Sequence, residues 1–350
     1  MQTPIPAPGS RDPSPFPGAA KVTVVVPNYN HGPFLRRRIE SILQQTYRDF
    51  EVVILDDASS DNSHSVIEQF TADPRIRFFP SEVNSGIPAR QWNRGVREAN
   101  GEYVWIAESD DRAERDFLET MVARLDAHPN VGLAYCQSCV IDADDNILGS
   151  GASHAAWFDR TRWTRDFIGD GRRECSRYLV YRNTIPNASA VLFRRSEYIA
   201  AGWADESLRY GHDQLMWARM LLRSDLLFVS RALNYFRRHA GAFGTQTSLR
   251  GDPGRFFRKL ARTLADSQAA RADRKLRAQL HYLRGRRAVC EARPLLARRH
   301  FARSLRTRPL ATPLVCWIST FFGARFKRAA WKVHHGAPWA VRMLCKLDSL

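Results

Sequence analysis

The chain has 350 residues, of which 44% are hydrophobic, 25% charged and 11% aromatic. This composition excludes collagen-like and wholly disordered proteins, and because no run approaches the roughly 18 apolar residues of a membrane-spanning helix, it also excludes polytopic membrane proteins. The length fits about two domains of roughly 150 residues each.

The net charge of +17 is concentrated in the last third of the chain. Residues 1–250 hold 30 Lys and Arg against 31 Asp and Glu, whereas residues 251–350 hold 23 against 5. A neutral body with a strongly basic extension suits a polyanion, either a nucleic acid or the anionic surface of a membrane.

The first twenty residues are rich in proline and have no basic segment followed by an apolar core. We therefore interpret 1–20 as a disordered leader and not as a secretory signal. The six cysteines are scattered, and Cys136 and Cys139 have no second pair or histidines nearby to complete a metal site. Ordinary thiols fit a reducing compartment, so we expect a cytoplasmic protein.

Between residues 21 and 141, short apolar runs alternate with stretches of helical spacing. The pattern predicts strands at 22–26, 51–55, 76–79, 103–107 and 131–141, and helices at 34–43, 59–70, 88–99 and 117–125. This alternation is typical of βαβ units, so we predict an α/β fold with a doubly wound, mostly parallel sheet. Ligands of such sheets bind at the carboxyl ends of the strands.

The pattern changes twice in the second half of the chain. From about residue 150 to 250 four tryptophans and many polar residues separate short strand-like pieces, which is typical of a second substrate site attached to the core. From about residue 252 onward the sequence is helical and rich in arginine. Within it, 283–309 resembles a single tetratricopeptide-like helical hairpin.

Two acidic clusters directly follow predicted strands: Asp56-Asp57, and Glu108-Ser109-Asp110-Asp111. Crowded carboxylates repel one another unless a cation neutralises them, and their oxygens are ligands that suit Mg²⁺ or Mn²⁺. A divalent ion held there could grip a diphosphate and stabilise it as a leaving group. One acidic loop is ordinary on an α/β protein, but two at the ends of different strands indicate a site.

Five segments carry a resemblance to a known family: VVVPNYN (24–30), SILQQT (41–46), VILDDAS (53–59), NSG (84–86) and GEYVWIAESDD (101–111). In this order and spacing they resemble the nucleotide-sugar-binding half of an inverting family 2 glycosyltransferase with the GT-A fold. The resemblance continues more weakly to about His239. It implies a GT-A domain over 21–250, with a nucleotide-sugar-binding half at 21–111 and an acceptor half at 112–250, followed by a basic helical extension at 251–350.

The resemblance also implies roles for residues that follow the strands. Pro27 and Tyr29 match positions that line the nucleotide base, and Asp57 matches the acid that hydrogen-bonds uracil in users of UDP-sugars. Glu108-Ser109-Asp110 falls on the DxD motif, whose last Asp binds the metal that bridges the two phosphates. Glu replaces the first Asp and is expected on the nucleotide. Asp111 either supports the site from behind, or is a solvated loop charge or a cap for the helix that follows.

An inverting transfer needs a base that takes the proton of the acceptor hydroxyl. The family supplies it from a Glu-Asp pair that opens a helix, and here Asp213 matches the base while His212 replaces the Glu. The alternative for Asp213 is a plain helix N-cap, a position where Asp is strongly preferred. We expect Asp205 and Glu206 to be loop charges.

Three further residues are implied on the acceptor side. His239 matches a late histidine that completes the metal or phosphate site, with Arg237 and Arg238 beside it either pairing with phosphate or solvated. Asn187 and Ser189, in the segment PNASA (186–190), match the loop that approaches the donor sugar and acceptor. A simple turn is the alternative for that segment.

The whole pattern predicts a glycosyltransferase that depends on Mn²⁺ or Mg²⁺. It would move a sugar from a UDP-sugar to a hydroxyl of a glycan or lipid-linked acceptor, in the synthesis of a cell-surface polysaccharide. Aromatic and basic residues interleave over 309–350, which suits helices that lie in an anionic membrane interface. The alternative is a helical subdomain that packs on the core.

Two other function classes are weighed against this interpretation. A sugar nucleotidyltransferase would need a Gly-rich loop with Lys or Arg after the first strand, and residues 28–31 are Asn, Tyr, Asn and His. A non-enzymatic protein that binds nucleic acid or membrane through its basic extension would leave the acidic clusters unexplained. We therefore expect no nucleic-acid partner.

Overall fold

A computed structural model describes residues 20–152, 159, 161–239, 252–266, 274–307 and 313–314. Its strands are β1 (Val22–Asn28), β2 (Phe50–Asp56), β3 (Ile76–Pro80), β4 (Tyr103–Ile106), β5 (Arg112–Ala113), β6 (Val131–Ile141), β7 (Ile147–Ser150), β8 (Phe167–Gly169), β9 (Val191–Arg194) and β10 (Asp225–Arg237). Its longer helices are α1 (Gly32–Leu43), α2 (Ser63–Glu68), α3 (Pro88–Glu98), α4 (Phe117–Asp126), α7 (Arg195–Ala200), α8 (His212–Leu221), α10 (Pro253–Asp266), α11 (Arg274–Cys290) and α12 (Pro294–Thr307). Short turns of helix add α6 (Gly171–Glu174), η1 (Arg162–Thr164), η2 (Cys175–Leu179) and η3 (Ala188–Ala190).

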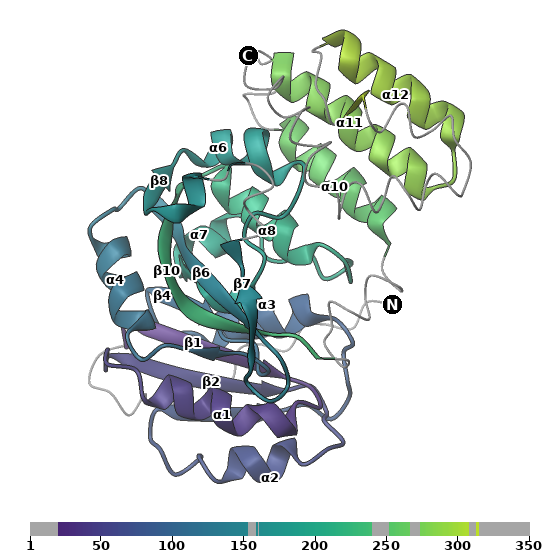
Figure 1. Ribbon diagram of the computed structural model, residues 1–350. Coiled ribbons are helices and arrows are strands. Elements are labelled where there is room, and N and C mark those ends of the chain that lie inside the picture. The colour runs from purple at the N-terminus through teal and green to yellow at the C-terminus, as the bar shows by residue number, and fades with distance from the viewer. Residues whose placement is uncertain are drawn as a thin grey trace.

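All ten strands belong to one sheet in the order β3-β2-β1-β4-β9-β6-β10-β5, with β7 beside β6 and β8 beside β10 (Figure 1). Strands β3, β2, β1 and β4 are parallel, and so are β6 and β10. Strand β9 lies antiparallel between β4 and β6 and so joins the two parallel groups. The predicted α/β fold with a mostly parallel sheet is confirmed.

Helices cover both faces of the sheet. Helices α1, α2 and α4 pack on one face through an apolar cluster that contains Leu35, Ile67 and Phe117. Helices α3, α7 and α8 pack on the other face through a second cluster that contains Trp92 and Trp217. The buried strands β1 and β2 have no exposed residue, which explains why their sequences are apolar runs and do not alternate.

The second helix is shorter than predicted, starting at Ser63 instead of Ser59. Asp56 accepts hydrogen bonds from the backbone N–H and the hydroxyl of Ser59, and Asn30 Oδ1 accepts the N–H of Ser60. These bonds hold 59–61 against the ends of β1 and β2. The polar residues therefore form a loop at the sheet edge, where the sequence pattern suggested a first helical turn.

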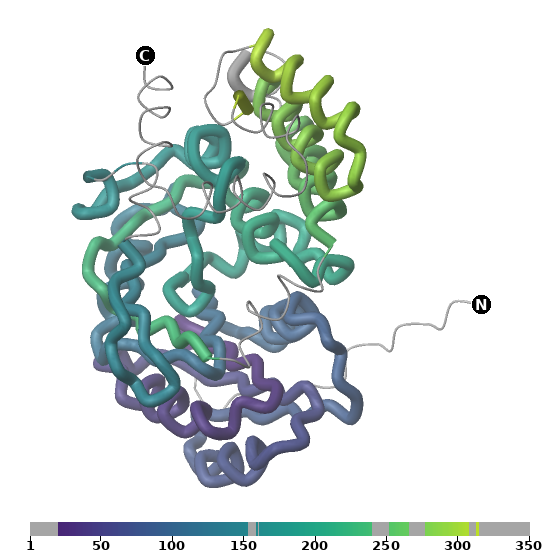
Figure 2. The backbone as a smooth tube through the Cα atoms, turned by 45° about the vertical axis from the view of Figure 1, so that its right-hand side comes forward, coloured from purple at the N-terminus to yellow at the C-terminus, as the bar shows by residue number. Residues whose placement is uncertain are grey.

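The described helices of the basic extension pack against the acceptor half (Figures 1 and 2). Phe256 and Leu260 of α10 and Phe301 of α12 join the apolar cluster around α8. The hairpin predicted over 283–309 is present as α11 and α12, and Gly285 allows it, because a Cβ there would meet the Phe301 ring at 2.3 Å. The described helices α10, α11 and α12 therefore pack on the acceptor half.

Two predictions fall mainly on residues that are not described. The disordered leader covers residues 1–20, of which only Ala20 is described, and the membrane-interface segment covers 309–350, of which only 313 and 314 are described. Among the described helices, none combines the length and apolar character that a membrane crossing requires.

Candidate active site

The carboxyl ends of β1, β2 and β4 meet at one edge of the sheet, because β1 pairs in parallel with both neighbours. The loops that follow these strands carry Tyr29 to His31, Asp57 to Asp61 and Glu108 to Asp111. His239 reaches the same edge from the acceptor half, two residues after the end of β10. The two predicted acidic clusters therefore lie at the same edge of the sheet.

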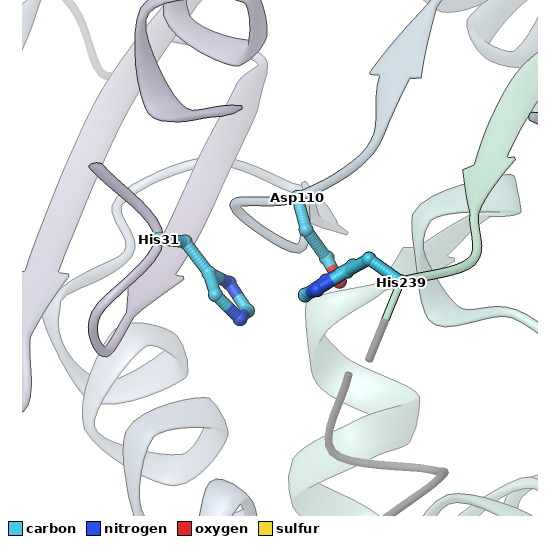
Figure 3. Close-up of side chains that lie close together, drawn as sticks. All are labelled: His31, Asp110 and His239. Atoms are coloured by element: carbon cyan, nitrogen blue, oxygen red, sulfur yellow. The ribbon is translucent and has the colours of Figure 1, made fainter. Parts of the chain in front are cut away.

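His31, Asp110 and His239 form a cluster in which the ligand atoms of the three side chains all lie within 4.8 Å of one another (Figure 3). His239 Nε2 is 3.1 Å from Asp110 Oδ2, and the rings of His31 and His239 are 5.4 Å apart between centroids. The structure thus brings together Asp110 and His239, the two residues predicted as metal ligands, from positions 129 residues apart in the chain.

His31 is the member of this cluster that the sequence analysis missed. It lies three residues after β1, the strand that pairs with β4, so its position beside Glu108 to Asp111 follows once the strand order is known. His31 Nδ1 lies 2.8 Å from the Ser109 hydroxyl, which orients the imidazole ring. Ser109, the middle residue of the DxD-like motif, therefore positions the His31 side chain of the cluster.

Charge is distributed unevenly among the three neighbouring acids. Burial raises the pKa of Glu108 to about 8 and also raises the pKa of Asp111, and the Asp110 carboxylate adds to both shifts. Burial acts in the same direction on Asp110, but the hydrogen bond with His239 and the two imidazoles outweigh it and lower its pKa. Asp110 is therefore the acid that stays ionised beside the two histidines.

A buried cation also acts on these acids. The Arg38 guanidinium on α1 is fully buried and lies 4.7 Å from the Trp105 ring centroid, and none of its nitrogens has a hydrogen-bond partner among the described residues. Burial lowers the pKa of Arg38 to about 10, although the neighbouring acids oppose that change. It remains charged at neutral pH and offsets part of the negative charge of the cluster.

The donor atoms of the cluster fit a divalent metal ion. Two imidazoles and one carboxylate converge, and an ion held by three protein ligands keeps open positions for phosphate oxygens. Mg²⁺ prefers oxygen ligands alone, whereas Mn²⁺ also accepts imidazole. The residues present therefore fit Mn²⁺ better than Mg²⁺.

Glu108 lies apart from this cluster, on the far side of the motif. Its carboxylate accepts the Trp92 Nε1–H at 2.9 Å, and its backbone N–H donates to the Ser189 hydroxyl at 3.0 Å. Asp111 points the opposite way and is buried, accepting from the Asn187 amide at 3.0 Å and from the Arg237 backbone N–H at 2.8 Å. The predicted solvated charge is therefore wrong, and so is the predicted cap of the following helix, because Asp116 is the N-cap of α4.

The predicted nucleotide-binding residues occupy the β1–β2 end of the rim. Pro27 is buried at the end of β1, and Tyr29 just beyond it presents a ring that is 46% exposed. The Asp57 carboxylate accepts hydrogen bonds from the Ser85 N–H, the Ser85 hydroxyl and the Gln91 amide. Asp57 thereby holds the 84–86 loop against the sheet edge.

Asp213 lies in the first turn of α8, but it is not the N-cap. The N-cap is Gly211, with φ of 71°, so the N-cap alternative for Asp213 is wrong. The Asp213 carboxylate accepts the Asn183 amide N–H at 2.7 Å. Asn183 was not identified from the sequence, because nothing in a loop asparagine indicates which partner it meets across 30 residues.

His212 connects the start of α8 to the motif around Glu108. Its ring packs edge-on against Trp92 at 5.1 Å between centroids, and Trp92 in turn donates to Glu108. Burial lowers the pKa of His212, against the opposing effect of Asp213. His212 is therefore a neutral packing residue at neutral pH, which explains how it can replace a glutamate there.

The segment 183–189 links the two halves of the site. Asn183 binds Asp213, Asn187 binds Asp111, and Ser189 accepts the backbone N–H of Glu108. Asn187 also caps the short helix η3 by accepting the N–H of Ser189. The segment is thus more than a simple turn, since each of these side chains makes a contact across the sheet edge.

The two arginines before His239 have different environments. Arg237 is buried and donates to the carbonyl oxygens of Asp110 and Asp142 and to the Asp145 carboxylate. Arg237 was predicted either to pair with phosphate or to be solvated. Both predictions are wrong, because these hydrogen bonds occupy its guanidinium and hold the end of β10. Arg238 is exposed, and its backbone N–H donates to Ile141.

The remaining predicted loop charges are paired. Asp205 makes an ion pair with Lys259 of α10, and its carboxylate also lies near Arg219. Glu206 accepts the Asn93 amide N–H and lies near Arg90. Asp205 therefore ties the acceptor half to the extension.

Comparison with known proteins identifies the family. The family model described as glycosyl transferase family 2 matches residues 23–176. Glycosyltransferase GlyG of Streptococcus pneumoniae is 39% identical over 235 residues, which are 63% of this chain and 72% of that protein. TarS of Staphylococcus aureus, a poly(ribitol-phosphate) β-N-acetylglucosaminyltransferase, is 31% identical over 110 residues, which are 31% of this chain and 19% of that protein.

Solved structures show the same fold. The structure of TarS residues 1–349 in complex with UDP-GlcNAc aligns with a TM-score of 0.63 at 18% identity, covering 86% of this chain and 90% of that one. The mannosyltransferase PcManGT of Pyrobaculum calidifontis, in complex with GDP-Man and Mn²⁺, aligns with a TM-score of 0.53 at 19% identity, covering 97% and 92%. The chain belongs to glycosyltransferase family 2 and is a glycosyltransferase with the GT-A fold.

Proposed function

We propose that this glycosyltransferase is metal-dependent and inverting, and that it moves a sugar from UDP to a hydroxyl of a glycan or lipid-linked acceptor in cell-surface polysaccharide synthesis. One observation carries this proposal: the segment 183–189 joins Asp213 to the acids that flank Asp110. A base and a metal-binding cluster at one site are what an inverting transfer from a diphosphate donor requires.

His31, Asp110 and His239 would hold the divalent ion, and Mn²⁺ suits this donor set better than Mg²⁺. Bound there, the ion would neutralise the charge that develops on the departing diphosphate. The Ser109 hydroxyl orients the His31 ring, and the Asp110 carboxylate is ionised. Neither His31 nor Asp110 must therefore rearrange before the ion binds.

Asp213 would accept the proton of the acceptor hydroxyl as its oxygen attacks the anomeric carbon and the bond to the diphosphate breaks. The hydrogen bond from Asn183 leaves the second carboxylate oxygen of Asp213 for that proton.

Tyr29 and Asp57 would bind the nucleotide base. The exposed Tyr29 ring offers a surface for stacking, and Asp57 holds the loop beside it. UDP is favoured by the resemblance of Asp57 to the uracil-binding acid and by the likeness to TarS, whose structure contains UDP-GlcNAc. PcManGT contains GDP-Man, so guanine is the competing base.

A screen of UDP- and GDP-sugars for hydrolysis tests the proposal, with Mn²⁺, with Mg²⁺ and with EDTA. We expect release of UDP from one UDP-sugar, faster with Mn²⁺ than with Mg²⁺, and none with EDTA. Release that persists in EDTA would contradict the metal assignment. Turnover of GDP-sugars alone would contradict the assignment of Asp57 to uracil.

A further inference from the structure

A cavity of about 210 Å³ is lined by residues of β6, of β10 and of the loop that precedes β9. Four aromatic side chains line it: Tyr135, Trp163, Phe228 and Phe236. The Trp163 Nε1–H donates to the Tyr135 hydroxyl at 2.8 Å, so the indole N–H is paired within the wall. The volume is below the roughly 300–1,000 Å³ of pockets for drug-sized ligands and suits a single sugar-sized group.

Three polar groups on the wall have no hydrogen-bond partner within the described residues: the Thr184 hydroxyl, the Gln137 amide nitrogen and the Arg238 guanidinium. Thr184 is 3% exposed, and a buried hydroxyl that lacks a partner costs free energy. Arg238 is the one charged side chain that the described residues contribute to the wall. The cavity is therefore ready to accept hydroxyls and one negative charge.

The wall of the cavity is continuous with residues of the proposed site. Thr184 directly follows Asn183, whose amide binds Asp213. Asn187 lines the cavity and also donates to Asp111, and on the opposite wall Arg238 directly precedes His239. The cavity therefore adjoins the proposed site through Asn187, which binds Asp111, and through the 183–184 segment, which binds Asp213.

We propose that this cavity binds the acceptor unit next to the attacking hydroxyl, and that Arg238 selects acceptors with an anionic group, a phosphate or a carboxylate, on that unit. This inference rests on the proposed function. The half-buried ring of Phe236 packs against the apolar face of a sugar ring. Thr184 and Gln137 hydrogen-bond its hydroxyls, and the Arg238 guanidinium pairs with the anion through two parallel N–H donors.

The binding of glucose, glucuronic acid and glucose 6-phosphate to the full chain, measured by saturation-transfer NMR, tests this inference. Each sugar is measured with UDP and Mn²⁺ present and again without them. We expect at least one of the two anionic sugars to bind more tightly than glucose. The one that binds more tightly shows whether the cavity prefers a carboxylate or a phosphate. Arg238→Gln should weaken that anionic sugar about tenfold, the scale of one charge-assisted hydrogen bond, and leave glucose unchanged. Thr184→Val is nearly isosteric and should weaken all three.

Arg115→Gln is the matched control, because Arg115 is equally exposed and lies outside the cavity. Equal binding of the anionic sugar by wild type and Arg238→Gln, or no binding of any of the three sugars, would overturn the inference. The proposed function fails separately: a chain that binds no nucleotide but still selects anionic sugars through Arg238 is a glycan-binding protein. If the chain binds UDP but Arg238→Gln does not change sugar binding, only the acceptor inference fails.

Discussion

The nucleotide-sugar-binding half and the acceptor half organise their polar residues over different distances along the chain. In the first, Asp56 meets Asn28 and Asp57 meets Ser85 across 28 residues, a separation of one βαβ unit. The polar residues of the second reach back to the first half: Asn187 reaches Asp111 across 76 residues and His239 reaches Asp110 across 129. The contacts within one βαβ unit can form as soon as that unit folds. The contacts made by Asn187 and His239 form only after β9, β10 and α8 have packed.

This difference suggests that the two halves respond differently to mutation. The nucleotide-binding rim should survive changes in the acceptor half, because its hydrogen bonds close within β1 to α3. The base and the cavity should be lost when either half or the extension is disturbed. Four changes, taken from the largest expected effect to the smallest, break or sharpen this comparison.

Asp110→Asn removes a carboxylate where the two halves meet. Transfer should fall about 1,000-fold or more, since metal ions contribute several kcal/mol to such reactions. Mn²⁺ binding followed by electron paramagnetic resonance should be lost while the fold remains. Asp144→Asn, in an exposed loop, is the control and should bind Mn²⁺ as wild type does. Full Mn²⁺ affinity in Asp110→Asn would refute the ligand assignment.

Asp213→Asn changes the acceptor half alone. The side chain keeps its shape and loses its basicity, so transfer should fall about 100-fold or more, the usual contribution of a general base. Nucleotide affinity, measured by calorimetry, should stay at the wild-type value. Glu206→Gln is the control, because Glu206 is a paired loop charge in the same segment and should retain its rate. Normal transfer by Asp213→Asn would remove it from the mechanism.

Gly211→Ala tests how the extension supports the base. Gly211 has φ of 71°, and a Cβ there would lie 2.5 Å from the Phe256 ring of α10. The strain and the clash together should lower the free energy of unfolding by about 1–3 kcal/mol, measured by urea denaturation, and should lower transfer without changing nucleotide affinity.

Gly202→Ala separates these two causes. Gly202 has a φ of 86°, but its added Cβ would meet nothing within 4 Å. It therefore carries the backbone strain without the contact to α10. If Gly202→Ala lowered transfer as much as Gly211→Ala, the packing of α10 under α8 would have no bearing on the base.

The smallest effect concerns pH and the extension. Burial, with Arg284 and Arg303 nearby, lowers the pKa of both His281 and His300 below the ordinary value of 6.5. The folded extension therefore binds fewer protons than the unfolded chain, so stability should fall as the pH drops below about 6.5. Melting curves at falling pH should show a smaller loss for the His281→Gln and His300→Gln double variant than for wild type. His128 is half-buried and lies outside the extension, so His128→Gln is the control and should behave as wild type.

Much of the fold was predictable because burial leaves a pattern in the sequence. Strands β1, β2 and β4 are apolar because both of their faces are covered, and each helix between them repeats apolar residues at helical spacing. The start of α2 was not predictable from this pattern. Hydrogen bonds from Asp56 and Asn30 hold residues 59–61 in a loop, and such bonds leave no periodicity.

The candidate site divides in the same way. Asp57 and Asp110 follow strands directly, so their presence at the sheet edge was determined by the sequence once the strands were recognised. The place of His31 depends on β1 pairing with β4, and the different environments of Arg237 and Arg238 depend on which carbonyl groups the end of β10 meets. Side chains that follow one strand can be located from the sequence, because the direction of the chain places them. Side chains that meet across the sheet edge were decided only by tertiary packing, because such contacts depend on strand order and crossing geometry that no local pattern encodes.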